Sequence, residues 1–297
     1  MAEPEPGREL KRCAGCSTVL YCNKECQKAA WPQHRTFCQP AKARHNSTQA
    51  EGGPEAVHGP FSSMAVYVDA LTYWRQSHYQ AIQTIVKGHA VLEGGVEREA
   101  SHPHKMLFFR LVLRDQGSAH SSRPRAPRNP ALTFALKEHY FMPREFVAAS
   151  CSSGDKTEDA ETEALHQLSL QDPSYAGFIP VIFNVEGIEI QLSGYYPQFR
   201  PAKPVRMAQE RKEQVVRAVL EFCQDSINGG FPLQVANSMV VPGKFVREEG
   251  KWEWKPSISD WESYCTGDEG NEALDATLER LDLPQSPSVM MSLVAAL

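Results

Sequence analysis

Hydrophobic residues recur every three or four positions along two long stretches of this chain, which predicts two amphipathic helices. The first stretch covers residues 62–93 and is followed by a glycine pair at 94–95. The second covers residues 207–227 and is also followed by a glycine pair, at 229–230. Glycine adopts the left-handed backbone that stops a helix, so these pairs set the expected boundaries. A shorter helix is predicted over residues 271–283.

Short apolar or alternating runs predict strands in the same part of the chain. Residues 106–113 and 132–136 are expected to pair as a hairpin with a long polar loop. Residues 178–192 and 240–255 each contain a Glu-Gly pair between two runs, which predicts a tighter hairpin. Strands combined with separate helices in this way are typical of an α+β body.

Five residues with chemically interesting side chains fall on these predicted elements. His78 and His89 lie three turns apart on the first helix, too far for one metal ion, so we interpret both as partly buried members of its apolar stripe. Cys223, on the second helix, is interpreted as a small core residue. Trp252 and Trp254 alternate along a strand and share one face, where packing is favoured over a ligand pocket.

The N-terminal part of the chain is separated from these elements by a predicted linker. Residues 39–60 contain several glycines and prolines and few apolar residues. We therefore expect a small N-terminal module over residues 1–38. A mixed body of helices and antiparallel strands should follow over residues 61–297.

The composition fits an intracellular protein with a sizeable core. The chain has 297 residues, of which 41% are hydrophobic, and a formal net charge of -5. This charge disfavours a nucleic-acid surface along the whole chain. No apolar run of about 18 residues occurs, so neither a spanning helix nor a membrane partner is expected. The first ten residues lack the apolar segment of a secretory signal, and the sequence does not distinguish nucleus from cytoplasm.

Most of the potential metal ligands lie together near the N-terminus. The segment CAGCSTVLYCNKECQKAAWPQHRTFC has the spacing C-x2-C-x5-C-x3-C-x7-H-x3-C. Its six potential ligands are Cys13, Cys16, Cys22, Cys26, His34 and Cys38. Thiolates separated by two residues can close around one zinc ion, and a His and a Cys four residues apart share one helix face. The other cysteines, Cys151, Cys223 and Cys265, are dispersed, which favours a reducing compartment over a disulfide framework.

This segment closely resembles the MYND zinc finger. The resemblance rests on the pattern Y-C-x3-C-Q-x3-W-x2-H-x3-C, preceded by C-x2-C. The residues that carry it are Tyr21, Cys22, Cys26, Gln27, Trp31, His34 and Cys38, with Cys13 and Cys16 before them. Nine residues at fixed offsets make a specific signal, which covers under a tenth of the chain.

The resemblance implies a cross-braced finger with eight ligands and two zinc ions, whereas this sequence offers six ligands. On this comparison one zinc site is complete, with the ligands Cys13, Cys16, His34 and Cys38. Cys22 and Cys26 match a third pair whose partner pair is missing, so the second site is incomplete. One expectation is that the chain as given begins too late, after the missing pair. The rival expectation is a genuine one-zinc variant.

Two further zinc arrangements stay open. A second ion could bind Cys22 and Cys26 more weakly with help from water, Glu3 or Glu5. Alternatively, the first four cysteines could hold one ion and leave His34 idle. The five residues between the two cysteine pairs would make that arrangement crowded.

The resemblance also implies a function, because MYND fingers bind short proline-rich peptides of partner proteins. The Gln and Trp that contact the peptide in the family match Gln27 and Trp31. An indole face suits proline rings, and an extended proline-rich ligand loses little entropy on docking. The competing interpretations are that Trp31 packs between finger and body, and that Gln27 is a solvated helix residue.

Two other functional classes match the sequence less well. Some MYND-containing chains are SET-domain lysine methyltransferases, but residues 61–297 contain neither the N-H-S/C-x-x-P-N type segment nor a later cysteine-rich segment. G-x-S-x-G, P-loop and G-x-G-x-x-G motifs are also missing, so no enzymatic activity and no catalytic residue are expected. Six basic residues against two acidic ones over residues 8–38 predict weak, salt-sensitive nucleic-acid binding without sequence specificity.

Overall fold

The computed structural model divides the chain into two compact units, residues 1–56 and 57–297. In the first unit it describes residues 11–12, 20–21, 24–25 and 28. In the second it describes residues 61–95, 105–114, 129–143, 167, 170–188, 190–267 and 270–297. Within these ranges, no helix has the length and hydrophobicity needed to cross a membrane.

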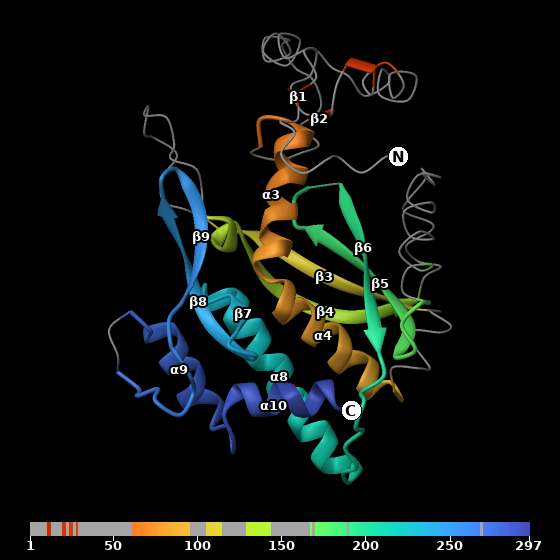
Figure 1. Cartoon of the computed structure of the whole chain (residues 1–297), viewed down its shortest axis with the longest axis vertical. Helices are drawn as coiled ribbons and strands as arrows, with labels where there is room; N and C mark the ends of the chain where they lie inside the picture. Colours follow the sequence, from red (N-terminus) through yellow and green to blue (C-terminus); the bar gives the residue numbers. More distant parts are fainter. Residues whose placement is uncertain are drawn as a thin grey trace. The chain divides into compact units, whose positions relative to one another are not determined.

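Two helices occupy the stretch where the sequence predicts one. α3 covers Met64–Ser77 and α4 covers Tyr79–Leu92, with a break at His78 (Figure 1). The prediction of one continuous helix is therefore wrong. His78 adopts φ -108° and ψ 16°, and its ring Nε2 lies 2.9 Å from the carbonyl oxygen of Ala131. A contact with a residue far away in the sequence thus accompanies the loss of regular helical geometry at this position.

The ends of the helices follow the expected capping chemistry. α3 begins after Ser63, whose hydroxyl oxygen accepts a 3.3 Å hydrogen bond from the backbone N–H of Val66. α4 ends just before the glycine pair at 94–95, in which both residues have positive φ. α8, Gln209–Gly229, ends at Gly230 with φ 73°. Both predicted glycine stops are therefore confirmed.

A four-stranded sheet forms one layer of the second unit. Its strands are β3 (Lys105–Leu113), β4 (Phe134–Pro143), β5 (Tyr175–Val185) and β6 (Gln191–Phe199), in the order β4-β3-β5-β6. The predicted hairpin pairs β3-β4 and β5-β6 are present and antiparallel. The strand expected over residues 132–136 begins later and runs further, after a 3-10 turn at Pro130–Leu132. β3 and β5 run parallel in the middle of the sheet, a pairing that the hydrophobic pattern did not predict.

A second, three-stranded sheet follows α8. Its strands are β7 (Leu233–Ala236), β8 (Met239–Glu248) and β9 (Lys251–Pro256), in chain order. The turn between β8 and β9 falls at Glu249 and Gly250, with φ 49° and 85°, which confirms the predicted hairpin. β7 and β8 are joined by Asn237 and Ser238, both also with positive φ, as a type I′ hairpin turn requires.

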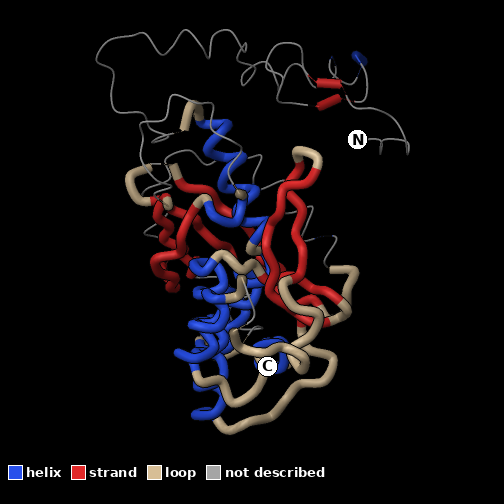
Figure 2. The backbone as a smooth tube through the Cα atoms, turned by 90° about the vertical axis from the view of Figure 1, so that its left-hand side faces the viewer, coloured by secondary structure: helices blue, strands red, loops and turns tan. Residues whose placement is uncertain are grey.

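Two short helices complete the chain. α9, Glu272–Leu281, matches the helix predicted over residues 271–283. α10, Pro287–Ala295, packs on α8 and α4 (Figure 1) and buries Met290, Met291 and Val294. The second unit is therefore an α+β body, in which helices lie beside the strands (Figure 2).

The core of this unit is built around Trp74 of α3. The indole is fully buried, and its N–H donates a 3.0 Å hydrogen bond to the carbonyl oxygen of Phe134 on β4. Its ring meets the rings of Phe134 and Phe183 edge-on, with centroids 6.1 and 6.4 Å apart. One side chain thus joins the helical layer to two strands of the sheet.

α4 and α8 approach each other closely where α4 carries Gly88. A Cβ atom at this position would lie 2.9 Å from Cδ2 of Leu220 and 3.2 Å from Cγ1 of Val216, both on α8. The first distance is shorter than ordinary van der Waals contact, so only glycine fits without a shift of its neighbours. The residue therefore sets the distance at which α4 packs against α8.

Candidate functional site

The N-terminal unit contains a short antiparallel ladder around the first cysteine pair. β1, Lys11–Arg12, pairs with β2, Leu20–Tyr21, with Lys11 opposite Tyr21 and Arg12 opposite Leu20. The sequence between the two strands, residues 13–19, contains Cys13 and Cys16, and Cys22 is the first residue after β2. The ladder therefore brackets the first two of the predicted ligands.

The predicted site residues themselves lie outside the described part of this unit. They are the metal ligands Cys13, Cys16, Cys22, Cys26, His34 and Cys38, and the peptide-contacting Gln27 and Trp31. Between β2 and Trp31, residues Lys24, Glu25 and Lys28 are helical and exposed. Which ligands share an ion, and whether Trp31 forms a docking face, thus stay predictions.

The donor set of the N-terminal segment matches zinc in its chemistry. Five thiols and one imidazole within 26 residues are the sulfur and nitrogen donors that zinc prefers, and four of them suffice for a tetrahedral site. A tetrahedral site filled by protein ligands leaves no open coordination position for a substrate, which is typical of structural zinc sites. For so short a segment, the free energy of zinc binding becomes free energy of folding.

The body contains two histidines in contact with each other, and the sequence analysis singled out only one of them, His89. His89 on α4 lies with its Nε2 2.6 Å from Nδ1 of His139 on β4. Burial and repulsion from His139 lower the pKa of His89 to about 3, and burial lowers the pKa of His139 to about 4. Both rings are therefore neutral near pH 7, and one donates a hydrogen bond to the other. His139 was missed because its partner lies on a helix 50 residues earlier.

This histidine pair is a structural contact and not a metal centre by itself. Among the residues that the structure describes, no group of three or more His, Cys, Asp or Glu side chains could hold a metal ion. The His89 ring also lies edge-on to Phe141, with ring centroids 5.6 Å apart. The pair thus joins α4 to β4 in apolar surroundings.

His78 is also buried, as the apolar stripe predicts. Its pKa falls to about 4, mainly because burial disfavours the charged ring and also because the positive charge of Arg114 lies nearby; the hydrogen bond to the carbonyl of Ala131 opposes this. The ring is therefore a neutral part of the core. Its position supports the interpretation as a stripe member over a ligand role.

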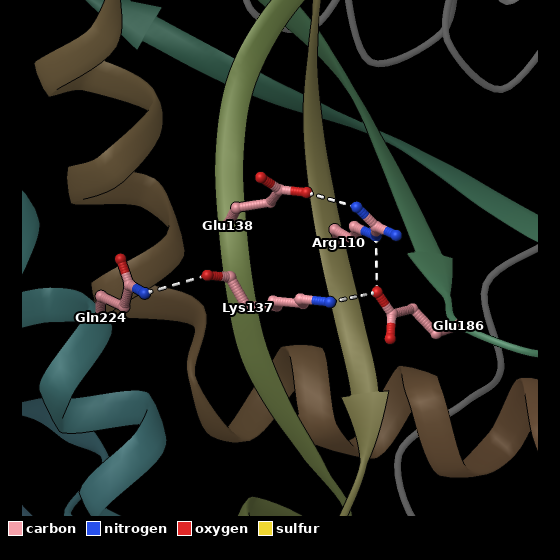
Figure 3. A network of polar contacts seen from close by, with 5 residues as sticks. All are labelled: Arg110, Lys137, Glu138, Glu186 and Gln224. Carbon is pink, nitrogen blue, oxygen red and sulfur yellow. Dashed lines mark hydrogen bonds and ion pairs between the residues drawn. The ribbon is translucent and has the colours of Figure 1, made fainter.

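A network of charged side chains lies on the four-stranded sheet (Figure 3). Arg110 contacts Glu138 at 2.8 Å and Glu186 at 2.7 Å, and Lys137 contacts Glu186 at 2.8 Å. The hydrogen bond from Lys137 is the first cause that lowers the pKa of Glu186. The two positive and two negative charges compensate one another, and all four side chains remain partly exposed. Such a network contributes little to stability and carries no spare charge for catalysis.

Cys223 and Trp254 pack against the rest of the body, whereas Cys265 does not. Cys223 is fully buried, and this burial raises the pKa of its thiol, as expected for a core residue. Cys265 is exposed. Trp254 donates a 3.0 Å hydrogen bond from its indole N–H to the carbonyl oxygen of Pro232 and packs over Gly243. The packing interpretation is therefore confirmed for this residue.

Comparison with known proteins identifies the N-terminal segment. The model of the MYND finger family matches residues 4–38, a range that includes all six predicted ligands. SET domain-containing protein 14 of Caenorhabditis elegans is 45% identical over 38 residues, which are 13% of this chain and 9% of that protein. A SET and MYND domain-containing protein of Dictyostelium discoideum is 46% identical over 35 residues, 12% of this chain and 6% of the relative.

A third relative is named for the finger alone. MYND-type zinc finger protein samB of Aspergillus clavatus is 47% identical over 34 residues, which are 11% of this chain and 6% of that protein. No solved structure matches the chain. The matched segment thus spans less than a tenth of each of these relatives.

Proposed function

Because residues 4–38 are a MYND finger, we propose that this protein binds a proline-rich segment of a partner protein through its zinc-stabilised N-terminal module. The observation that carries the proposal is the match of this finger to its family. We further propose that the finger covers residues 1–38, that residues 39–60 are a linker, and that residues 61–297 form the attached body.

In the proposed finger, one zinc ion is held by the first cysteine pair of the segment together with the histidine and the last cysteine. These ligands are Cys13, Cys16, His34 and Cys38. They supply three sulfurs and one nitrogen, a donor set that closes a tetrahedral site. Cys22 and Cys26 then form half a site, so any second ion binds more weakly.

Elemental analysis of the purified full chain tests this arrangement. We expect one tightly held zinc in the wild type and none in His34→Ala. Cys265→Ser serves as the control, because this exposed thiol lies in the body and should leave the zinc content unchanged. An unchanged zinc content in His34→Ala would favour a site made of the first four cysteines. Two tightly held ions in the wild type would contradict both arrangements.

The docking face is proposed to consist of Trp31 and Gln27. A flat indole stacks well on proline rings, and a proline-rich segment is already extended before it binds. The amide of Gln27 can hydrogen-bond to the peptide backbone. An aromatic hot spot contributes about 2 kcal/mol or more to binding, whereas one exposed hydrogen bond contributes about 0.5–1.5 kcal/mol.

Fluorescence anisotropy of labelled proline-rich peptides, titrated with the full chain, tests this face. We expect Trp31→Ala to abolish capture while zinc content is retained, and Gln27→Ala to weaken capture less. Lys24→Ala provides a matched control, since Lys24 is an exposed helical residue of the same module. Peptides with alanine in place of proline should not bind. Equal capture by wild type and Trp31→Ala would refute the proposed face.

An enzymatic role is the second candidate, because two relatives are named for a SET domain. Their similarity to this chain covers the finger, and we propose that the body lacks methyltransferase activity. Transfer of a labelled methyl group from S-adenosylmethionine to histones and generic peptides provides the assay. Transfer above background by the full chain would overturn this part of the proposal.

A further inference from the structure

The segment that joins β6 to α8 carries two prolines separated by two residues. Residues 200–206 read Arg-Pro-Ala-Lys-Pro-Val-Arg, and the prolines are Pro201 and Pro204. The segment is neither helix nor strand (Figure 1). A polyproline II helix has three residues per turn, so prolines at this spacing lie on one edge of it. The segment therefore has the Pro-x-x-Pro pattern of ligands that bind in this conformation.

Nearly all of this segment faces solvent. Residues 202–206 are exposed, and Pro201 is half-buried. The exposed part includes the apolar side chain of Val205, 36% of which is accessible. Packing within the described body thus accounts neither for the second proline nor for the valine that follows it.

Hydrogen bonds hold the segment on both sides of its middle but leave the middle free. The backbone N–H of Arg200 donates to the carbonyl oxygen of Ser174 at 2.6 Å, and that of Val205 donates to the carbonyl oxygen of Ala296 at 2.9 Å. Between them the chain bends at residues 202–203, whose backbone groups form no hydrogen bond with any described residue. Straightening these two residues into polyproline II therefore breaks no such bond, and the neighbouring proline rings already fix φ at about -65°.

The segment carries positive charge alone. Its charged residues are Arg200, Lys203 and Arg206, and the first carboxylate after them is that of Glu210. No carboxylate in the described ranges of the body forms an ion pair with Lys203 or Arg206. A guanidinium can bind a carboxylate through two parallel hydrogen bonds. Arg206, two residues after the second proline, is therefore free to bind an acidic group beside a proline-binding groove.

A second Pro-x-x-Pro of the described body, at residues 284–287, has a structural explanation. Pro287 is buried in the first turn of α10, where proline is favoured because its missing N–H would have no partner in the helix. The residue two positions further on is Val289, which brings no charge. The pattern at residues 200–206 is thus distinguished by its exposure and by its arginine.

We propose that residues 200–206 are a docking site for a protein partner that recognises polyproline II through an aromatic groove with an acidic end, as SH3 domains do. Pro201 and Pro204 pack between the aromatic rings, and Arg206 pairs with the carboxylates. The finger of this chain matches the segment less well, because residues 8–38 carry six basic residues against two acidic ones and repel it. The inference concerns the body and does not rest on the function proposed for the finger.

Isothermal titration calorimetry of the full chain against a panel of purified SH3 domains that bind Pro-x-x-Pro-x-Arg peptides tests this proposal. We expect at least one domain to bind. The double variant Pro201→Ala, Pro204→Ala should weaken this binding by at least about tenfold, and so should Arg206→Glu. Circular dichroism checks that each variant is folded. Absence of binding by the whole panel would overturn the proposal, as would wild-type affinity in the double variant.

Three control variants separate this segment from other prolines and from simple charge attraction. Pro284→Ala, at an exposed proline of the other described pair, should bind like the wild type. The double variant Pro124→Ala, Pro127→Ala alters a further Pro-x-x-Pro of the sequence and should also retain binding. Arg211→Glu makes the same charge change as Arg206→Glu at an exposed residue of α8 outside the segment, and should change the affinity little. A tenfold loss in any of these controls would refute the assignment to residues 200–206.

Discussion

The finger and the body encode their structures in opposite ways. The finger places six ligand-type side chains within 26 residues, and its identity is readable from their spacing alone. The body buries a large hydrophobic cluster drawn from every described helix and strand layer, with partners that lie far apart in the sequence. Spacing around a metal tolerates few changes, whereas many combinations of apolar residues fill a core equally well. Closely spaced metal ligands can therefore be recognised in a sequence, whereas a core built from distant apolar residues cannot.

This comparison predicts that the two units respond to different perturbations. The stability of the body should depend on burial and on the protonation state of its core histidines. The stability of the finger should depend on zinc. Five experiments sharpen or break this distinction, and each follows the unfolding of the body in the full chain by far-UV circular dichroism in denaturant.

The largest effect is expected from acidification. His78, His89 and His139 have folded pKa values of about 3 to 4, below the ordinary value of 6.5. The unfolded chain therefore binds more protons, so the stability contributed by these residues is complete above about pH 6.5. It is lost as the pH falls towards the folded pKa values. Between pH 7 and pH 5 we expect the free energy of unfolding of the body to fall by roughly 4–6 kcal/mol, about 2 per histidine.

Gln substitution at His139 checks the origin of this pH dependence. His139→Gln removes one titrating ring and the repulsion that it exerts on His89, while an amide can still hydrogen-bond to His89 and face Gln224. The dependence of unfolding free energy on pH between 7 and 5 should become shallower. A slope equal to that of the wild type would show that this histidine pair does not control it.

Loss of the central indole comes next. Trp74→Ala removes a fully buried side chain and leaves the carbonyl oxygen of Phe134 without its donor. We expect the free energy of unfolding to fall by about 3–5 kcal/mol. Tyr73→Ala, at the adjacent and exposed position on the same helix, should change it by less than about 0.5 kcal/mol. Similar costs for both variants would contradict the assignment of Trp74 to the core.

A smaller loss of stability is expected from substitution of Arg114, which donates hydrogen bonds to carbonyl oxygens at the end of α8. Its Nη2 donates to the carbonyl oxygens of Ile227 and Asn228 at 2.8 and 2.6 Å. Arg114→Met should destabilise the body by about 2 kcal/mol, because charge-assisted bonds to the last helical carbonyls are lost. Arg247→Met, at an exposed arginine, is the matched control. Arg247→Met should change the free energy of unfolding little. If it destabilised the body as much as Arg114→Met does, Arg114 would have no specific role at the end of α8.

The smallest effect on the body should come from the finger. Cys13→Ser is expected to unfold the finger, seen as loss of zinc and of dispersed finger signals in NMR spectra. The free energy of unfolding of the body should change by less than about 0.5 kcal/mol. A clearly destabilised body would break the comparison, because the two units would then share their stability.

Local periodicity was sufficient to predict most helices and hairpins of the body. The stripes of α8 and α9 and the glycine stops after α4 and α8 depend on residues within a few turns of one another. The break at His78 could not be predicted, because it accompanies a bond to Ala131 on a distant segment. The parallel pairing of β3 with β5 was missed for the same reason, since the strands that pair are not neighbours in the sequence.

The candidate sites also differ in whether the local sequence was enough to predict them. All six predicted ligands of the finger lie in one segment, so their spacing alone was enough to make that prediction. A polar pocket beside α4 and β6 was not predicted, since Lys87 and Gln198, which both line it, are brought together only by the packing of α4 against β6. On a sequence, Lys87 is an ordinary charged residue in a helix. Its significance depends on burial, which periodicity alone assigns poorly to a long amphipathic side chain.

The close approach of α4 and α8 at Gly88 has an evolutionary consequence. Any larger residue at this position meets Leu220, so the sizes of the two side chains are coupled. Among relatives of the body, growth at position 88 should be accompanied by shrinkage at position 220, and the sum of the two volumes should vary less than either volume. This compensating pair would trace the descent of the body through sequences whose other core residues have diverged.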